Sequence, residues 1–396
     1  MNTLIVKNYL KVEAFIVLIF IFQYFFYIKD LTTLYYLQKL IIPILLSLVA
    51  IFILFKSRNN ESEKHIFYIF LGYCCLLTLS ALGSTIHFDQ PIISSLIAEG
   101  KLISASYIFL GYYYFKIRKI TEQELLNISV ILFWITIFVY LYLHYSIDPA
   151  KYWYEESQLF ILDSKGYRMR LPVQLITLVS FYALASLKKS KLNIIIYLTT
   201  LLYLTMLHAQ RYYLFAFILT SLIIIIMQYY KKYWKSVVFL GLPIIIFISL
   251  QSSELVGYLL KVDSIAIRGD RFFVIQNYLE KANLYNFIFG VGEINENWQL
   301  KEYLLGSKFS ASDYGFLGII YEYGIAGLIF FISFYFYALS SFKRMKGEFL
   351  IGLKFYLIFT FVLTLLSPYL FYYAGLLCGM MGIYNNYRVK APSHEC

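Results

Sequence analysis

Two arginines, Arg268 and Arg271, stand three residues apart in the stretch "AIRGDRFF". On a helix, residues at this spacing share a face, so both guanidinium groups can hold one phosphate or diphosphate through several charge-assisted hydrogen bonds. A second interpretation is that they pair with Asp263 and Asp270 on a solvated face. The spacing alone leaves both interpretations open.

A third arginine, Arg211, lies in "LHAQRYYLF", the short connection between two long apolar segments. A lone arginine at such a boundary either extends to lipid headgroups or points into a cleft where it binds an anion. The sequence fits both roles equally well.

Two carboxylates mark the stretch "SDYGFLGIIYEYGIAGLIFF", Asp313 at its entry and Glu322 inside it. They are nine residues apart, about 900° of helical rotation, so a continuous helix would point them in opposite directions. A bend or a close helix contact is expected at Gly324 and Gly327. We therefore expect Asp313 to face the arginine-containing loop and Glu322 to have a structural role.

Glu99 and Lys101, in "SLIAEGKLIS", are two residues apart and so lie on nearly opposite sides of a helix. This excludes a simple ion pair within that helix, and each side chain needs another partner or the membrane interface. Lys101 is expected to extend to the interface. Glu99 either does the same or lines a site.

The elements that must position these residues are membrane helices. Hydrophobic residues make up 60% of the chain and charged residues 14%, and apolar runs of about twenty residues recur. We predict one all-α, polytopic membrane domain over residues 1–396 with about 12 transmembrane helices. The expected spans are 12–28, 33–55, 65–83, 94–115, 125–145, 171–187, 192–208, 212–230, 236–250, 315–341, 349–367 and 369–386.

The basic residues give this arrangement an orientation, because lysine and arginine are retained on the cytoplasmic side of short loops. The clusters "KSRNNESEK", "KIRK", "KKSK", "KKYWK" and "KRMK" all fall on one side, together with both termini. Loops on that side hold 19 lysines and arginines against 6 acids, and loops on the other side hold 12 against 13. Both termini are therefore predicted to be cytoplasmic, and the net charge of +11 indicates an anionic inner leaflet as its partner, not nucleic acid.

Two outer loops, residues 146–170 and 251–312, are longer than the other connections, and long ordered loops are usually functional. The larger loop contains a helix-like piece in which Phe272, Ile275 and Tyr278 recur at helical spacing, followed by a break at "GVGE". This pattern predicts an amphipathic helix on the outer membrane surface, followed by a turn.

The order of these features resembles the Wzy-type O-antigen polymerases and, more distantly, the O-antigen ligases. The resemblance consists of Arg211 in a tight outer connection, a long outer loop with arginines, then "FIFGVGE", and then "SDYGFLGIIYEYGIAGLI" entering a span. It covers roughly residues 192–342, whereas the flanking spans match only in number and hydropathy. The expected architecture is similar to that of GT-C-type membrane glycosyltransferases.

The resemblance implies a glycosyltransferase of the bacterial inner membrane that works on the periplasmic face without a cofactor or a metal. Such an enzyme transfers a growing glycan from its undecaprenyl diphosphate carrier onto a second carrier-linked repeat unit. The product is lipopolysaccharide O-antigen, and a separate chain-length regulator is expected as a partner.

The implied site residues follow from the same resemblance. Arg211, Arg268 and Arg271 would hold the leaving diphosphate, and Gly290, Gly292 and Glu322 are further substrate-binding candidates. Asp313 stands where the ligases carry a histidine; it would receive the proton of the acceptor hydroxyl, orient that hydroxyl, or cap the following helix.

Four other functions are alternatives to a polymerase. Twelve spans with both termini inside are also the plan of secondary transporters and of lipid-linked oligosaccharide flippases. No repeat relates the two halves of the chain, and a flippase has little use for a sixty-residue outer loop. An O-antigen ligase shares the resemblance, and an acyltransferase would need a set of histidines that the five here do not form.

Overall fold

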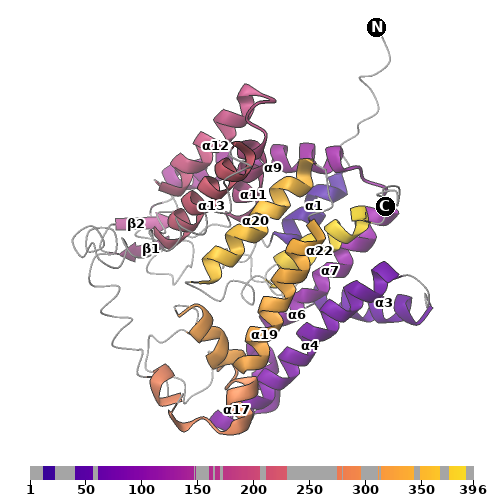
Figure 1. Cartoon of the computed structure of the whole chain (residues 1–396), viewed down its shortest axis with the longest axis vertical. Helices are drawn as coiled ribbons and strands as arrows, with labels where there is room; N and C mark the ends of the chain where they lie inside the picture. The colour runs from indigo at the N-terminus through magenta and orange to yellow at the C-terminus, as the bar shows by residue number, and fades with distance from the viewer. Residues whose placement is uncertain are drawn as a thin grey trace.

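The computed structural model describes residues 12–22, 41–56, 61–146, 148, 160–163, 166–169, 173–205, 211–229, 274–278, 280–295, 311, 314–342, 348–365 and 374–388. Helices dominate these residues (Figure 1). The longer helices are α1 (Val12–Ile21), α3 (Ile42–Lys56), α4 (Glu61–Phe88), α9 (Glu122–Ser146), α11 (Gln174–Ala185), α12 (Lys191–Tyr203), α13 (Arg211–Tyr229), α19 (Phe316–Phe342), α20 (Glu348–Thr364) and α22 (Ala374–Arg388).

The shorter elements among the described residues are seven helical pieces and two strands. The helical pieces are α5 (Ile92–Ala98), α6 (Gly100–Ile103), the 3₁₀ turn η3 (Ser104–Ser106), α7 (Tyr107–Phe109), the π-helical turn η4 (Leu110–Tyr114) and α8 (Phe115–Ile117), with α17 (Leu284–Phe289) further along the chain. The strands are β1 (Phe160–Asp163) and β2 (Gly166–Met169).

Three helices are long and apolar enough to cross a membrane: Glu63–Phe88, Glu122–Ser146 and Phe316–Ser340. Five shorter apolar helices accompany them in the described residues. Each predicted span overlaps a helical segment except 236–250, which lies outside the described residues. The structure is therefore that of a helical protein compatible with a membrane location, and the count of twelve spans stays a prediction.

A short β-hairpin departs from the all-helical prediction. Strands β1 and β2 pair antiparallel, with Phe160 opposite Met169 and Asp163 opposite Gly166. They lie within the outer loop predicted at 146–170, so this loop contains secondary structure that its sequence did not suggest.

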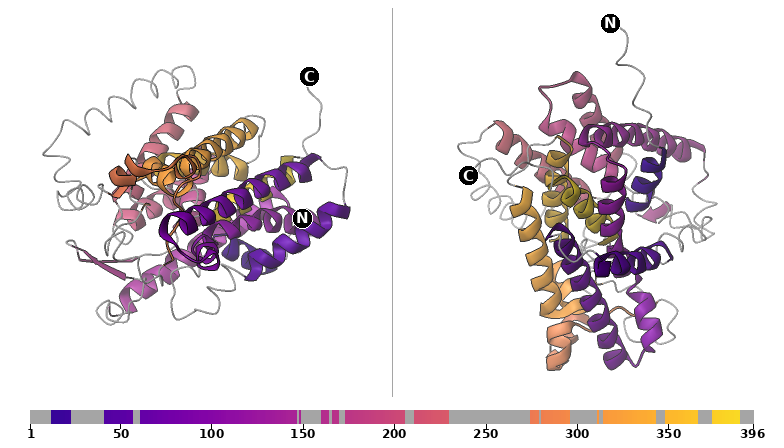
Figure 2. Two further views of the ribbon diagram at one scale, coloured as in Figure 1. Left: turned by 90° about the horizontal axis from the view of Figure 1, so that it is seen from below. Right: turned by 90° about the vertical axis from the view of Figure 1, so that its right-hand side faces the viewer.

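The long helices form two neighbouring groups (Figures 1 and 2). In one group, α11 packs against α9, α12, α13 and α20. In the other, α4 and α19 lie side by side, and α17 contacts both of them. The contact between α19 and α20 joins the groups.

Helix α22 is held by close backbone approach to the irregular segment from η3 to η4. A Cβ atom added at Gly382 would overlap the carbonyl oxygen of Ile108 and lie 2.8 Å from the nitrogen of Tyr112. A Cβ added at Gly111 would overlap the carbonyl oxygen of Gly379. Small residues at such a contact let two helices approach closely, which is how helices associate where apolar burial supplies little driving force.

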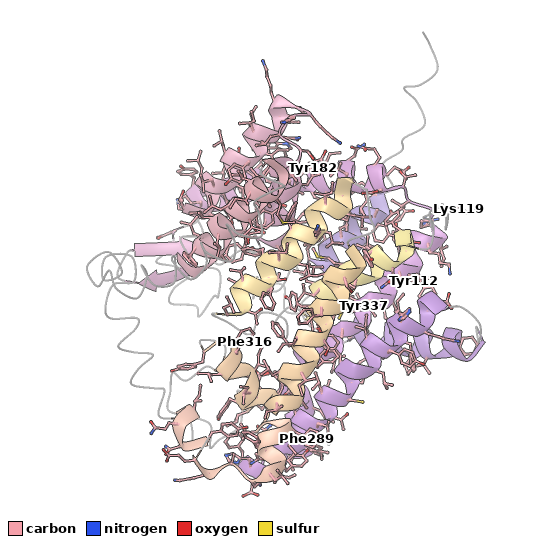
Figure 3. All side chains as sticks on the ribbon, in the orientation of Figure 1. Tyr112, Lys119, Tyr182, Phe289, Phe316 and Tyr337 are labelled. Carbon is pink, nitrogen blue, oxygen red and sulfur yellow. The ribbon has the colours of Figure 1, made fainter. Side chains whose placement is uncertain are left out.

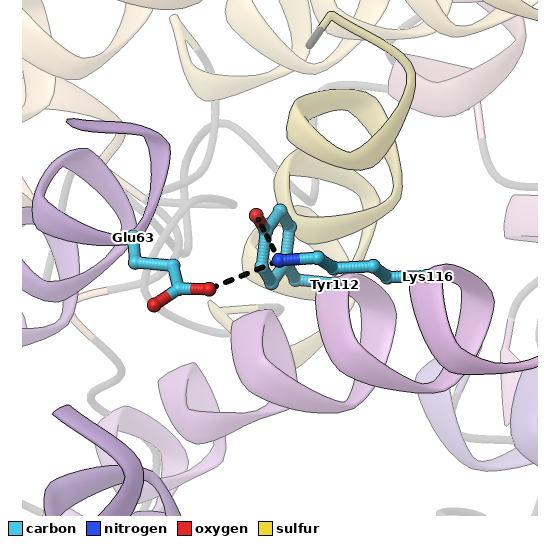
Figure 4. A network of polar contacts seen from close by, with 3 residues as sticks. All are labelled: Glu63, Tyr112 and Lys116. Atoms are coloured by element: carbon cyan, nitrogen blue, oxygen red, sulfur yellow. Dashed lines mark hydrogen bonds and ion pairs between the residues drawn. The ribbon is translucent and has the colours of Figure 1, made fainter. Parts of the chain in front are cut away.

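Polar contacts gather at one end of the bundle. Lys116 Nζ lies 3.0 Å from Glu63 Oε1 and 3.2 Å from the hydroxyl of Tyr112 (Figure 4). Arg118 forms an ion pair with Glu13 of α1, and the backbone nitrogen of Leu350 donates to Glu122 Oε1 at 3.1 Å. These contacts join ends of helices that are far apart in sequence.

The close packing of α22 predicts unequal effects for the same substitution at two glycines. Gly382→Ala meets backbone atoms, whereas Gly72→Ala in α4 meets only the ring edge of the partly buried Phe330, which can rotate away. Both gain up to about 1 kcal/mol of helix propensity, so their difference isolates the contact. Overpacking should cost Gly382→Ala about 1–3 kcal/mol.

The measurement is the apparent melting temperature of each variant in detergent. Gly382→Ala should melt several degrees below both the parent protein and Gly72→Ala. Equal melting of the two variants would contradict the backbone contact.

Candidate functional site

The predicted site residues divide into those that the structure describes and those that it does not. Asp313, Arg268 and Arg271 lie outside the described residues. Arg211 begins α13, but its side chain is likewise outside what is described. Their roles as catalytic and diphosphate-binding residues therefore stay predictions.

Glu322, Gly290 and Gly292 are described, and they lie together at one end of the bundle. This end is formed by the last two turns of α4, by α17 and the residues after it, and by the first turns of α19. Phe289 marks it in Figure 3, whereas Lys119 lies at a different end of the molecule.

A buried carboxylate, Glu99, connects these elements. It is fully buried at the break between α5 and α6. Its Oε1 accepts hydrogen bonds from Ser80 Oγ at 2.5 Å and from the backbone nitrogen of Glu293 at 3.0 Å, and its Oε2 accepts from the hydroxyl of Tyr323 at 3.1 Å. Burying a carboxylate is costly unless donors replace its water, and here three segments supply them.

The expectation that Glu99 needs partners outside its own helix is confirmed. Its importance was nonetheless missed, because its donors are 19, 194 and 224 residues away in sequence. The one available signal was a carboxylate followed by glycine inside a predicted span, which indicated a polar break but not its partners.

The "GVGE" turn pairs with α19 through backbone hydrogen bonds. The nitrogens of Val291 and Gly292 donate to the carbonyl oxygens of Tyr321 and Glu322 at 2.9 and 3.0 Å. The predicted break of the helix at this sequence is confirmed, because α17 ends at Phe289. The backbone nitrogens of this turn are therefore already engaged within the protein.

Two glycines with positive φ make this pairing possible. Gly290 has φ 83°, and Gly324 has φ 64° and ψ −166° in the middle of α19, where it forms the predicted kink. A Cβ at Gly290 would overlap the carbonyl oxygen of Glu322, and one at Gly324 would overlap that of Ile288. Each glycine therefore leaves room for the other segment's backbone, in a conformation that other residues rarely adopt.

Glu322 contributes its backbone carbonyl group to the site. The residue is only 4% exposed, and its carbonyl oxygen accepts from Gly292. Its position beside the kink fits the structural role expected for it. A substrate contact by Glu322, Gly290 or Gly292 stays a prediction.

A second buried polar residue, Gln90, fixes the chain just after the turn. Its Oε1 accepts from the backbone nitrogen of Asn295 at 2.7 Å, and its Nε2 donates to Ser95 Oγ at 2.9 Å. Asp89 before it has φ 53°, which is uncommon for a residue other than glycine. The loop after α4 therefore holds residues 293–295 in place.

The predicted amphipathic helix of the large loop is confirmed in part. Residues 274–278 are helical, but a new helix, α17, begins after Asn283, whose side chain caps it. Ile275 and Tyr278 are buried against Phe88, Val291 and neighbouring residues, so this apolar face packs on the protein. Phe272 lies outside the described residues.

Comparison of the chain with protein-family models and with curated proteins finds no match. Among the described residues, no three histidine, cysteine, aspartate or glutamate side chains are placed to hold a metal ion. The site is thus defined by its own geometry: a buried carboxylate, a glycine turn and a kinked helix.

The Glu99 network predicts a graded loss of stability. Glu99→Ala leaves Ser80, the Glu293 nitrogen and Tyr323 without this acceptor and should cost about 3 kcal/mol or more. Tyr323→Phe removes one donor and leaves the carboxylate those from Ser80 and from the Glu293 nitrogen, so it should cost about 1 kcal/mol. Melting in detergent measures both, and limited proteolysis between α17 and α19 reports the local release. Equal losses in the two variants would show that Glu99 does not join these segments.

Proposed function

We propose that this protein is an O-antigen polymerase of the bacterial inner membrane. It joins undecaprenyl-diphosphate-linked repeat units on the periplasmic face by metal-independent glycosyl transfer. The acceptor hydroxyl forms a new bond to the anomeric carbon of the donor glycan while the bond from that carbon to the carrier diphosphate breaks.

The observation that carries this proposal is the contact between the "GVGE" turn and the first turns of α19. The turn Gly290–Glu293 and the kinked segment Tyr321–Gly324 are about thirty residues apart in sequence, and they pair directly through their backbones. The family resemblance rests on the same two segments. Their pairing supports reading them as parts of one site.

The proposed orientation is supported by which helix ends contact each other. Glu63, Lys116, Arg118 and Glu122, all in predicted cytoplasmic connections, take part in polar contacts at one end of the bundle. The outer ends predicted for α4 and α19 meet instead around Glu99. Predicted cytoplasmic ends thus contact one another, and so do predicted outer ends. Helices that cross a membrane in alternating directions require this arrangement.

In the proposed reaction, cations hold the diphosphate and stabilise the charge that develops as it leaves. Arg211, Arg268 and Arg271 suit this role because guanidinium groups stay charged and match phosphate geometry. Asp313, at the entry to the α19 segment, would orient the acceptor hydroxyl or receive its proton. The hydrogen bonds of Glu99 would hold the "GVGE" turn and the first turns of α19 together, next to these arginines and Asp313.

Deleting the gene provides the first test. Loss of a polymerase should leave lipid A-core carrying a single repeat unit, which a lipopolysaccharide gel displays as one band in place of a ladder. An unchanged ladder would refute the proposal. Complete absence of repeat units would favour the flippase or the ligase instead.

A second test concerns the three arginines. Arg211→Ala, Arg268→Ala and Arg271→Ala should each shorten or abolish the ladder while the protein still inserts, because each removes a charge from the diphosphate site. Lys281→Ala is the matched control, since Lys281 is an exposed cation of the same predicted loop. If all three arginine variants make full-length chains, the assigned diphosphate site is wrong.

A further inference from the structure

His87 occupies the last turn of α4, on the rim of the site described above. One turn earlier, Gly83 packs against the carbonyl oxygen of Gly290, where an added Cβ would lie at 2.5 Å. The next residue, Phe88, is buried in a cluster with Val291 and Tyr321. The histidine is itself exposed, so it stands at the surface directly beside the "GVGE" turn.

The ring of His87 is held at one nitrogen only. Its Nδ1 lies 2.9 Å from Asn286 Nδ2, and its face packs edge-on against Phe88 at 4.6 Å between ring centroids. Among the described residues, Nε2 has no hydrogen-bond partner. As far as the described residues extend, the second nitrogen is therefore open to a molecule bound at the surface.

Asn286, the residue that holds the ring, is fixed by hydrogen bonds of its backbone. Asn286 is 2% exposed, and its backbone nitrogen donates to Asn283 Oδ1 at 2.7 Å. Its carbonyl oxygen accepts from the hydroxyl of Tyr278 at 2.8 Å and from the nitrogen of Gly290 at 2.6 Å. Burial raises the pKa of Tyr278 to about 12, so this hydroxyl stays a donor at neutral pH.

The side-chain amide of Asn286 can select the tautomer of the histidine. Its Oδ1 is buried without a hydrogen-bond partner among the described residues. A rotation of the amide by about 180° brings Oδ1 to His87 Nδ1, and the two amide orientations are equivalent in shape. When Oδ1 faces the ring, Nδ1 carries the proton and donates it to Oδ1. The lone pair of Nε2 is then free to accept a proton from another molecule.

We propose that His87 is the general base of the glycosyl transfer, held in its reactive tautomer by Asn286. This inference rests on the proposed polymerase function and deepens it. Nε2 takes the proton from the acceptor hydroxyl as that oxygen bonds to the anomeric carbon of the donor. The diphosphate leaves with the electron pair of the broken bond, and the imidazolium then releases its proton to water. Asp313 orients the hydroxyl or caps the helix.

Two local features act in opposite senses on the positive charge that His87 gains. The carbonyl groups at the C-terminal end of a helix stabilise a positive charge, and His87 lies in the last turn of α4. Partial burial of the ring disfavours the charge, because it removes water from the imidazolium. The titratable groups on the surrounding elements are Asp89 in the following loop, Tyr278 and Tyr285 around α17, Glu293 after the turn, Glu99 at the α5–α6 break, and Tyr321, Glu322 and Tyr323 on α19.

The decisive experiment measures polymerisation in vitro with purified protein and the lipid-linked repeat unit extracted from a strain lacking the gene. A positioned general base contributes about 10²–10⁴-fold, so His87→Gln should lower kcat by about 100-fold or more with little change in KM. Parent activity should rise with pH as a single basic group loses its proton, and this rise should be absent in His87→Gln. Imidazole added to His87→Ala should restore part of the rate, which a purely structural role would not allow.

The matched control is His144→Gln. His144 also lies in the last turn of a predicted span, α9, but its Nδ1 has no hydrogen-bond partner among the described residues. This variant should keep the parent rate and pH profile. Asn286→Ala should lower kcat less than His87→Gln does and leave the pH-dependent rise in place.

The outcomes separate this inference from the proposed function. If the parent protein polymerises and His87→Gln keeps its rate and pH profile, His87 is not the base and the polymerase function stands. If His87→Gln is inactive but imidazole does not rescue His87→Ala and the pH-dependent rise is also absent from the parent, the inference fails as well. If the parent forms no polymer and the deletion strain keeps its ladder, the proposed function itself fails.

Discussion

A carboxylate removed from water must be given donors, and Glu99 receives them from α4, from the turn after α17 and from α19. Each donor alone contributes little, because a hydrogen bond within the protein replaces one with water. Together they set a strong condition, since any motion that separates the three segments exposes an unsatisfied charge in an apolar surrounding. The remaining features of the site follow from this one residue.

The first consequence is the shape of α19. The helix is interrupted at Gly324, and the carbonyl groups released by the interruption are those that accept from the "GVGE" turn. A kink in a helix leaves backbone groups without partners, and here the turn supplies the missing donors. Glu99 and the glycine turn thus stabilise the same break from two sides.

The second consequence is a buried, hydrogen-bonded layer beneath the surface on which His87 lies. Asn286 belongs to this layer, whereas its neighbour His87 is exposed. A buried, hydrogen-bonded scaffold can hold a side chain in one orientation, which catalysis requires of a base. The proposed polymerase would place its lipid-linked substrates on this surface and its permanent cations above it.

The sequence by itself predicted the helical architecture of the protein and many of its local features. Long apolar runs predicted the helices, because a helix satisfies its own backbone and needs no distant partner. The break at "GVGE" and the bend at Gly324 were also predicted, since glycine marks such conformations locally. The strands β1 and β2 were missed, because so short a hairpin has little pattern of its own.

Only the tertiary structure decided which polar residues form the site. Sequence spacing pointed to arginines and to Asp313, each of which stands out within its own short stretch of chain. Glu99, Gln90 and the pair of His87 with Asn286 depend on contacts between residues 19 to 224 positions apart. Such contacts follow from how whole helices pack, and a single sequence holds no local record of that packing.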